Sequence, residues 1–249
     1  MGLMVIGHRG ARFEAPENTL AGFSYAVALG VDAVEFDIRL SRDGELVVIH
    51  DATVDRTTNG TGDVSSFTAA DLAALDARAG FDAVPLPCGV PTFDQVLDVL
   101  APSPLHLMIE IKKDAPEREA EIVRGVLSRL QARNLTGRAT ITSFDPVALE
   151  FVVQMAPAQR RGYIGAWDSD AFLETALRLG CVQADMHHVA VRGEMVRKAQ
   201  EAGLAVVGWP CNSQEEFDLL TGWGVDGVTT DSPSTILALR RETEVSALD

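Results

Sequence analysis

The chain contains few basic residues for its length. Lysine and arginine number 21 against 36 aspartates and glutamates, which gives the 249 residues a formal net charge of −15. Surfaces that bind nucleic acid or anionic membranes depend on basic patches, so this balance argues against both kinds of partner. Any phosphate group that the chain binds must therefore be met by a few local cations.

Cysteines and long hydrophobic runs are also scarce. The three cysteines, Cys88, Cys181 and Cys211, are odd in number and lack metal-ligand spacing, so we expect reduced thiols rather than disulfides or a zinc site. No stretch approaches eighteen consecutive apolar residues, and the N-terminus lacks a basic segment followed by a long apolar run. These absences predict a cytoplasmic protein without stable membrane association.

The chain does contain enough apolar sequence for one large core. Hydrophobic residues make up 47% of it and charged residues 23%, without a low-complexity linker. Because 249 residues fit one large α/β unit, we expect residues 1–249 to form a single domain.

Strand-like apolar segments alternate with amphipathic helical segments along the whole chain. The predicted strands occupy residues 4–8, 33–39, 105–112, 139–144, 161–165, 182–186, 205–209 and 226–230. The predicted helices occupy residues 19–29, 92–100, 118–132, 146–155, 170–179, 193–202, 214–222 and 233–241. Eight strand–helix units predict a TIM (β/α)8 barrel.

One region interrupts this alternation. Residues 41–45 carry a turn signal and residues 46–50 form a further apolar strand, which together predict a hairpin that extends the second strand. Residues 51–91 then form an insertion before the helix at 92–100. We therefore predict a barrel with a hairpin and small insertion at about residues 40–91.

Charged residues stand at alternate positions inside two of the predicted strands. Glu35 and Asp37 share one face of the second strand, as Glu110 and Lys112 share one face of the third, while Phe36 points the other way. Three carboxylates and a lysine at buried strand ends are unfavourable unless something compensates them. A divalent cation and an anionic ligand would do so.

The predicted topology brings further polar residues to these carboxylates. The hairpin returns His50 to the level of Glu35 and Asp37, at the barrel end where active sites of this fold lie. The first and third strands flank the second. The side chains expected to converge are His8, Arg9, Glu35, Asp37, His50, Glu110 and Lys112.

Structural explanations compete with this interpretation. The carboxylates of the second strand could pair with Arg39, and Trp209 could cover the core instead of forming a binding platform. Asn18 could cap the helix at 19–29, a role that is compatible with a ligand contact. We interpret Asp231 as a helix cap and leave it out of the catalytic set. The adjacent histidines at positions 187 and 188 also reach the mouth, but without an evident carboxylate partner we treat them as loop residues.

Five ordered blocks carry a family resemblance that extends over nearly the whole chain. They are Gly7-His8-Arg9-Gly10, Ala15-Pro16-Glu17-Asn18-Thr19, Val34-Glu35-Phe36-Asp37, Asp43-Gly44-Glu45-Leu46-Val47-Val48-Ile49-His50-Asp51 and Ile109-Glu110-Ile111-Lys112. Together they resemble the glycerophosphodiester phosphodiesterases. The resemblance implies hydrolysis of a glycerophosphodiester, such as glycerophosphocholine or glycerophosphoethanolamine, to glycerol 3-phosphate and an alcohol.

The resemblance also implies one divalent cation. Its ligands would be Glu35, Asp37 and Glu110, whose hard oxygens suit Mg²⁺ or Ca²⁺ and do not separate the two. The substrate-binding residues would be Arg9, Lys112, Asn18 and Trp209, with the two cationic side chains on the phosphate oxygens.

In similar enzymes the substrate's own 2-hydroxyl is thought to attack phosphorus, which gives a cyclic phosphate that water then opens. His8 and His50 can share the acid and base roles because histidine titrates near neutral pH. The sequence leaves the assignment open, and we favour His8 as base and His50 as acid.

Two other functions are compatible with the same fold. A lysophospholipase D-like lipid phosphodiesterase would need an apolar entrance, yet Phe67 is the only aromatic residue from 51 to 80. A non-catalytic metal or anion sensor would typically have lost a histidine or a carboxylate. The sequence also leaves open the alcohol of the substrate and whether the protein is a monomer or a homodimer.

Overall fold

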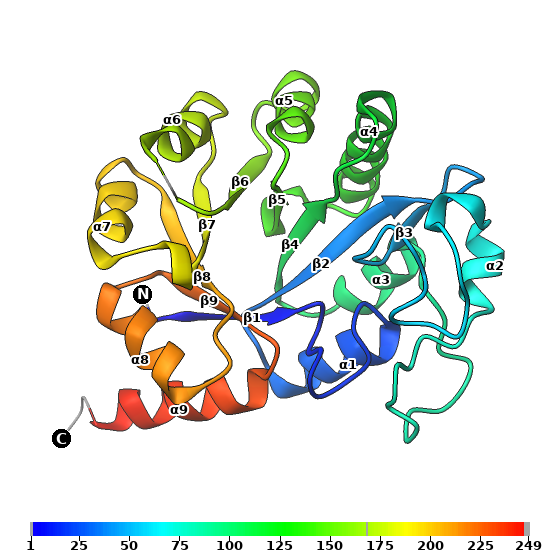
Figure 1. The fold of residues 1–249 in the computed structure, drawn as a ribbon, viewed down its shortest axis with the longest axis horizontal. Coiled ribbons are helices and arrows are strands. Elements are labelled where there is room, and N and C mark those ends of the chain that lie inside the picture. Colours follow the sequence, from blue (N-terminus) through cyan, green and yellow to red (C-terminus); the bar gives the residue numbers. More distant parts are fainter. Residues whose placement is uncertain (1, 168, 247–249) are drawn as a thin grey trace.

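The computed structural model describes residues 2–167 and 169–246, and within them eight parallel strands close into a barrel (Figure 1). The strands follow one another around the ring in chain order, and the pairing of the first with the last closes it. They are β1 (Met4–His8), β2 (Ala33–Leu40), β4 (His106–Ile111), β5 (Ala139–Ser143), β6 (Arg160–Gly165), β7 (Gln183–His187), β8 (Ala205–Trp209) and β9 (Gly227–Thr230). The predicted TIM barrel is confirmed.

Helices surround the outside of this ring (Figure 1). They are α1 (Leu20–Leu29), α3 (Phe93–Leu100), α4 (Pro116–Ala132), α5 (Pro146–Met155), α6 (Asp170–Arg178), α7 (Gly193–Glu201), α8 (Gln214–Trp223) and α9 (Pro233–Ser246). Each matches a predicted helix, although α9 continues five residues beyond the expected 241. Across the described residues, the helices are too short or too polar to span a membrane.

The β2 strand shows why the charged side chains face inward. Phe36 is fully buried on the outer face, where its ring lies 5.5 Å from that of Phe23 in α1 and 6.1 Å from that of Phe93 in α3. Because successive side chains alternate between faces, this packing directs Glu35 and Asp37 into the barrel. The apolar alternation therefore determines the orientation of the carboxylates.

The predicted hairpin is also present. Strand β3 (Leu46–Val48) pairs antiparallel with β2, with Ile38 opposite Val48. It is shorter than the expected 46–50, although the Ile49 amide still donates to the Asp37 carbonyl at 3.1 Å. The chain then leaves the ladder, which frees His50 to face the mouth.

The insertion after β3 packs around a small apolar cluster of its own, built on Val47, Ile49, Val54, Val64 and Leu72. It contains a short helix that the sequence analysis did not predict, α2 (Ala69–Ala73), beside β3 at one edge of the barrel (Figure 1). Single turns of 3₁₀ helix lie at Val64–Ser66, Thr136–Arg138 and His188–Ala190. The insertion cluster holds the end of the hairpin in place.

Candidate active site

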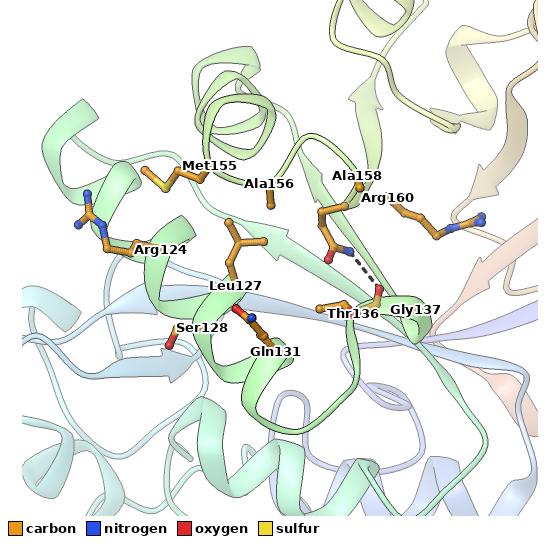
Figure 2. Close-up of a pocket in the computed structure, with 11 residues that line it drawn as sticks. Arg124, Leu127, Ser128, Gln131, Thr136, Gly137, Met155, Ala156, Ala158 and Arg160 are labelled. Carbon is orange, nitrogen blue, oxygen red and sulfur yellow. Dashed lines mark hydrogen bonds between the residues drawn. The ribbon is translucent and has the colours of Figure 1, made fainter.

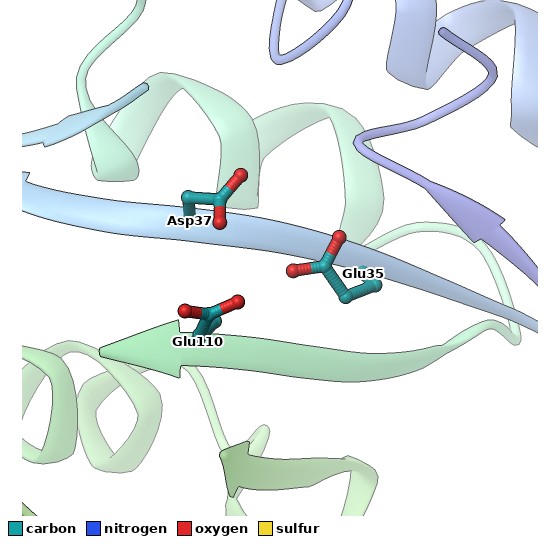
Figure 3. A group of neighbouring side chains, drawn as sticks. All are labelled: Glu35, Asp37 and Glu110. Carbon is teal, nitrogen blue, oxygen red and sulfur yellow. The ribbon is translucent and has the colours of Figure 1, made fainter. Parts of the chain in front are cut away.

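Three carboxylates from two neighbouring strands meet inside the barrel mouth (Figure 3). Glu35 and Asp37 project from β2, and Asp37 lies opposite Glu110 of β4 in the parallel register. One oxygen of each carboxylate lies within 4.8 Å of an oxygen of the other two, and all three residues are buried. The expected convergence of these carboxylates is therefore present.

The electrostatics of this triad suit a cation. Burial and repulsion from Asp37 raise the pKa of Glu35 well above its usual range, and the same two causes raise the pKa of Glu110 to about 7. Among the described residues, Glu35 Oε1 and Asp37 Oδ1 are buried without a hydrogen-bond partner. Hard oxygen donors in this state fit a divalent cation such as Mg²⁺ or Ca²⁺.

Two basic side chains lie against the triad. Lys112 Nζ lies 2.6 Å from Glu110 Oε1 and 3.4 Å from Asp37 Oδ1. Arg9 Nε lies 3.5 Å from Asp37 Oδ2, and the Arg9 amide donates to Glu35 Oε2 at 3.2 Å. Although burial opposes ionisation, Lys112 and Arg9 hold the pKa of Asp37 well below its usual range. Two cationic side chains thus lie beside the triad, within reach of an anion that would bind next to a metal there.

His50 is held from both its backbone and its ring. Arg39 Nε donates to the His50 carbonyl at 2.9 Å, so Arg39 anchors the end of the hairpin, contrary to the alternative in which it pairs with the strand carboxylates. His50 Nδ1 lies 2.6 Å from Asp51 Oδ1, and Arg56 Nε donates to Asp51 Oδ2 at 2.7 Å. Despite some burial, these contacts lower the pKa of Asp51 to about 2. Asp51 stays ionised and orients the ring.

His8 ends β1 and has a carboxylate partner of its own. Its Nδ1 lies 2.5 Å from Asp231 Oδ1, and its Nε2 lies 3.7 Å from Glu35 Oε2. Asp231 also accepts a hydrogen bond from Asn212 Nδ2 at 2.8 Å and lies 2.6 Å from Arg12 Nε. Burial is the main cause that lowers the pKa of His8, while Asp231 opposes it.

This contact of Asp231 with His8 was not predicted from the sequence, which had favoured a helix cap. The residue directly follows β9, and β9 pairs with β1 so that Thr230 lies opposite Gly7. A carboxylate one position beyond that pair falls beside His8. The strand order carried this signal, but the helix that begins at Pro233 favoured a capping role.

Asn18 does not cap α1. Thr19 is the capping residue, because its hydroxyl accepts from the Gly22 amide at 3.1 Å. Asn18 instead has a left-handed backbone with φ of 54°, and its Nδ2 donates to Asp37 Oδ2 at 2.8 Å. Its contact is thus with a carboxylate of the triad.

Trp209 ends β8 within a group of aromatic rings at the mouth. Its ring lies edge-to-face with Phe144 at 5.8 Å and with His187 at 4.6 Å. His188 Nδ1 bonds the Pro210 carbonyl at 2.8 Å. His188 Nε2 also lies 3.8 Å from a carboxylate oxygen of Glu216, so the expectation of no carboxylate partner was wrong for this histidine.

Two hollows differ sharply in chemistry. A cavity of about 130 Å³ at the mouth is lined by both histidines, two of the triad carboxylates and aromatic and apolar walls. A larger groove of about 790 Å³ lies outside the barrel between α4 and α5, where Arg124, Leu127 and Met155 line it (Figure 2). The described lining of the groove contains no carboxylate or histidine, whereas the mouth cavity has both kinds of side chain.

Comparison with known proteins identifies the chain. The sequence model of the glycerophosphoryl diester phosphodiesterase family matches residues 8–235. The chain belongs to this family. A glycerophosphodiester phosphodiesterase of Caldanaerobacter subterraneus is 33% identical over 97% of this chain and 99% of its own length, and one of Bacillus subtilis is 31% identical over 93% and 84%.

Solved structures agree with the family assignment. A phosphodiesterase of Oleispira antarctica, in complex with the product sn-glycerol-3-phosphate, superimposes with a TM-score of 0.87 at 29% identity and covers 94% of this chain and 95% of its own. A related structure from Silicibacter pomeroyi gives 0.89 at 27% identity, with 98% and 94% covered. This member of the family is therefore an enzyme of the phosphodiesterase class.

Proposed function

We propose that the enzyme hydrolyses glycerophosphodiesters, such as glycerophosphocholine and glycerophosphoethanolamine, to sn-glycerol 3-phosphate and an alcohol. One divalent cation, Mg²⁺ or Ca²⁺, is bound by Glu35, Asp37 and Glu110. The observation that carries the proposal is the buried triad, which lies beside two histidines that each contact a carboxylate. The product bound to the Oleispira antarctica relative supports a small-molecule substrate of this class.

Positive charge around the triad would bind the phosphate. The cation, when bound, supplies charge that stabilises the phosphoryl oxygens as the bond breaks. Arg9 and Lys112 hold the remaining phosphate oxygens, since both already lie within 3.5 Å of the carboxylates that would surround the ion. Asn18 keeps Asp37 in place through its amide.

The two histidines take the proton-transfer roles. Asp231 binds Nδ1 of His8, which leaves Nε2 toward the cavity, where it accepts the proton of the substrate's 2-hydroxyl as that oxygen attacks phosphorus. Asp51 binds Nδ1 of His50 in the same way, and His50 protonates the oxygen of the departing alcohol. In the second step the roles reverse: His50 accepts a proton from the water that attacks phosphorus, and His8 protonates the 2-oxygen as its bond to phosphorus breaks.

The test measures sn-glycerol 3-phosphate released from the two named substrates by metal-stripped protein, before and after addition of Mg²⁺ or Ca²⁺. We expect release only with a cation and its loss in His50→Ala. His106→Ala is the matched control, because His106 begins β4 at the opposite end of the barrel. Equal activity of metal-stripped and restored protein, or full activity of His50→Ala, would contradict the proposal.

A lysophospholipid substrate is the second candidate. Phe13, Phe144 and Val189 follow the carboxyl ends of three strands and are 58%, 46% and 67% exposed, which provides some apolar surface near the mouth. Faster choline release from lysophosphatidylcholine than from glycerophosphocholine would favour this candidate. The cytoplasmic location and the monomeric or homodimeric state stay predictions from the sequence.

A further inference from the structure

An additional carboxylate faces the triad from across the barrel. Asp185 projects from β7, which lies four positions from β2 in the ring of eight described strands and so on the opposite wall. The residue is 3% exposed and lines the mouth cavity. Gln183 Nε2 donates to Asp185 Oδ1 at 2.7 Å, but Oδ2 has no hydrogen-bond partner in the described part of the chain.

A buried hydroxyl that lines the same cavity also lacks a hydrogen-bond partner among the described residues. Thr142 of β5 is fully buried, lines the same cavity, and its Oγ1 finds no partner among residues 2–167 and 169–246. Gly162 separates the two: a Cβ there would lie 3.3 Å from Asp185 Oδ2 and 3.0 Å from Thr142 Cγ2. The glycine therefore keeps open a space between Asp185 Oδ2 and the Thr142 side chain.

Buried polar atoms without partners are unfavourable, so their presence on a cavity wall indicates a ligand that satisfies them. An aliphatic hydroxyl has the chemistry that both atoms need, because it can donate to Asp185 Oδ2 and accept from the Thr142 hydroxyl. The site thus has the chemistry of an alcohol-binding subsite.

The position of the site selects which part of the substrate it meets. The His50 side chain, assigned to the departing alcohol, is 30% exposed, whereas Asp185 and Thr142 are buried. The departing alcohol therefore lies on the open side and the glycerol on the deep side. The 2-hydroxyl must stay beside phosphorus for attack, which leaves the terminal hydroxyl of glycerol to reach the opposite wall.

We propose that Asp185 and Thr142 form a subsite that binds the terminal hydroxyl of the substrate's glycerol. The inference rests on the proposed function for the identity of the ligand. It has a consequence for selectivity, because an acyl group on that hydroxyl removes the donor and adds bulk in a buried pocket. Lysophospholipids are then poor substrates, and glycerophosphodiesters are preferred.

The first experiment compares kcat/KM for glycerophosphocholine and for 2-hydroxypropyl phosphocholine, which keeps the 2-hydroxyl and lacks the terminal one. We expect the wild type to prefer glycerophosphocholine by about 100-fold or more, because the analogue leaves the buried groups unpaired. In Asp185→Ala, and in the nearly isosteric Thr142→Val, kcat/KM for glycerophosphocholine falls while that for the analogue changes little. Asp98→Ala, at an exposed position of α3, is the control.

The second experiment does not depend on turnover. Calorimetry with Mg²⁺ present compares binding of sn-glycerol 3-phosphate with that of 2-hydroxypropyl phosphate, and the wild type should prefer the former at least tenfold, with the preference lost in Asp185→Ala. If neither diester is hydrolysed but this preference holds, the proposed function fails and the hydroxyl subsite stands.

The subsite proposal is overturned if the wild type treats the paired compounds alike, or if the variants lose both equally. It is also overturned if the loss of kcat/KM in the variants differs between glycerophosphocholine and glycerophosphoethanolamine, but not between compounds with and without the terminal glycerol hydroxyl. Thr142→Val keeps the test decisive should Asp185→Ala fail to fold.

Discussion

Replacement of Asp185 by asparagine should change how stability depends on pH. Burial raises the pKa of Asp185 to about 7, while an unfolded aspartate titrates near 3.8. Between these values the folded chain keeps a proton that the unfolded chain has lost. Stability from this group is therefore fully present below the lower value and is lost as the pH rises to the higher one.

The magnitude follows from the separation of the two pKa values. One unit corresponds to about 1.4 kcal/mol, so a separation of roughly three units corresponds to ~4 kcal/mol between pH 4 and pH 7 for this fully buried group. Asparagine carries no charge over this range. The unfolding free energy of the wild type, relative to that of Asp185→Asn, should therefore fall by ~4 kcal/mol as the pH rises from 4 to 7.

Urea unfolding of both proteins at half-unit pH steps, with a chelator present to keep the triad free of metal, measures this difference. Asp98→Asn provides the matched control, since its side chain is 71% exposed and should leave the slope unchanged. Curves for the wild type and Asp185→Asn that stay parallel from pH 4 to pH 7 would show that Asp185 is ionised in the folded state, and the reasoning from burial would be refuted.

Three further outcomes are expected. Asp231→Asn should lower kcat about 10³-fold with a smaller change in KM, because the His8 ring loses the carboxylate that orients it, and steady-state kinetics with glycerophosphocholine checks this. Glu110→Gln should weaken Mg²⁺ binding at least tenfold by calorimetry, because one of three oxygen ligands loses its charge. Phe36→Ala should lower the unfolding free energy by about 3–5 kcal/mol in urea titrations, since it empties the space between α1 and α3.

Much of the fold could be predicted because the hydrophobic periodicity of a strand or helix is visible within a short stretch of sequence. The alternation from Val34 to Ile38 gives both the strand and the direction of its carboxylates, and eight such units leave few topologies. The five-residue helix α2 was missed because it is shorter than two turns. This helix is stabilised by packing of its Leu72 in the insertion cluster, and no local sequence pattern predicts that tertiary contact.

The residues of the site likewise fall into those that could be predicted from the sequence and those that could not. Residues of the strands and the hairpin, such as Glu35 and His50, were placed by their period and by the expected pairing, whereas Asp231 was not. Asp231 is 223 positions from His8, and only the closure of the ring brings them together. For Asn18 the sequence left a capping role open, since two capping residues stand side by side, and the structure assigns the cap to Thr19.

The charge balance at the mouth explains how an acidic protein can bind an anionic substrate. The three carboxylates of the triad face the two cationic side chains of Arg9 and Lys112. When all five side chains are ionised, together they carry one net negative charge. A divalent ion would reverse this to one net positive charge, which equals and opposes the charge of a phosphodiester. Local charge at the loaded mouth, not the overall −15, would then decide where the substrate binds.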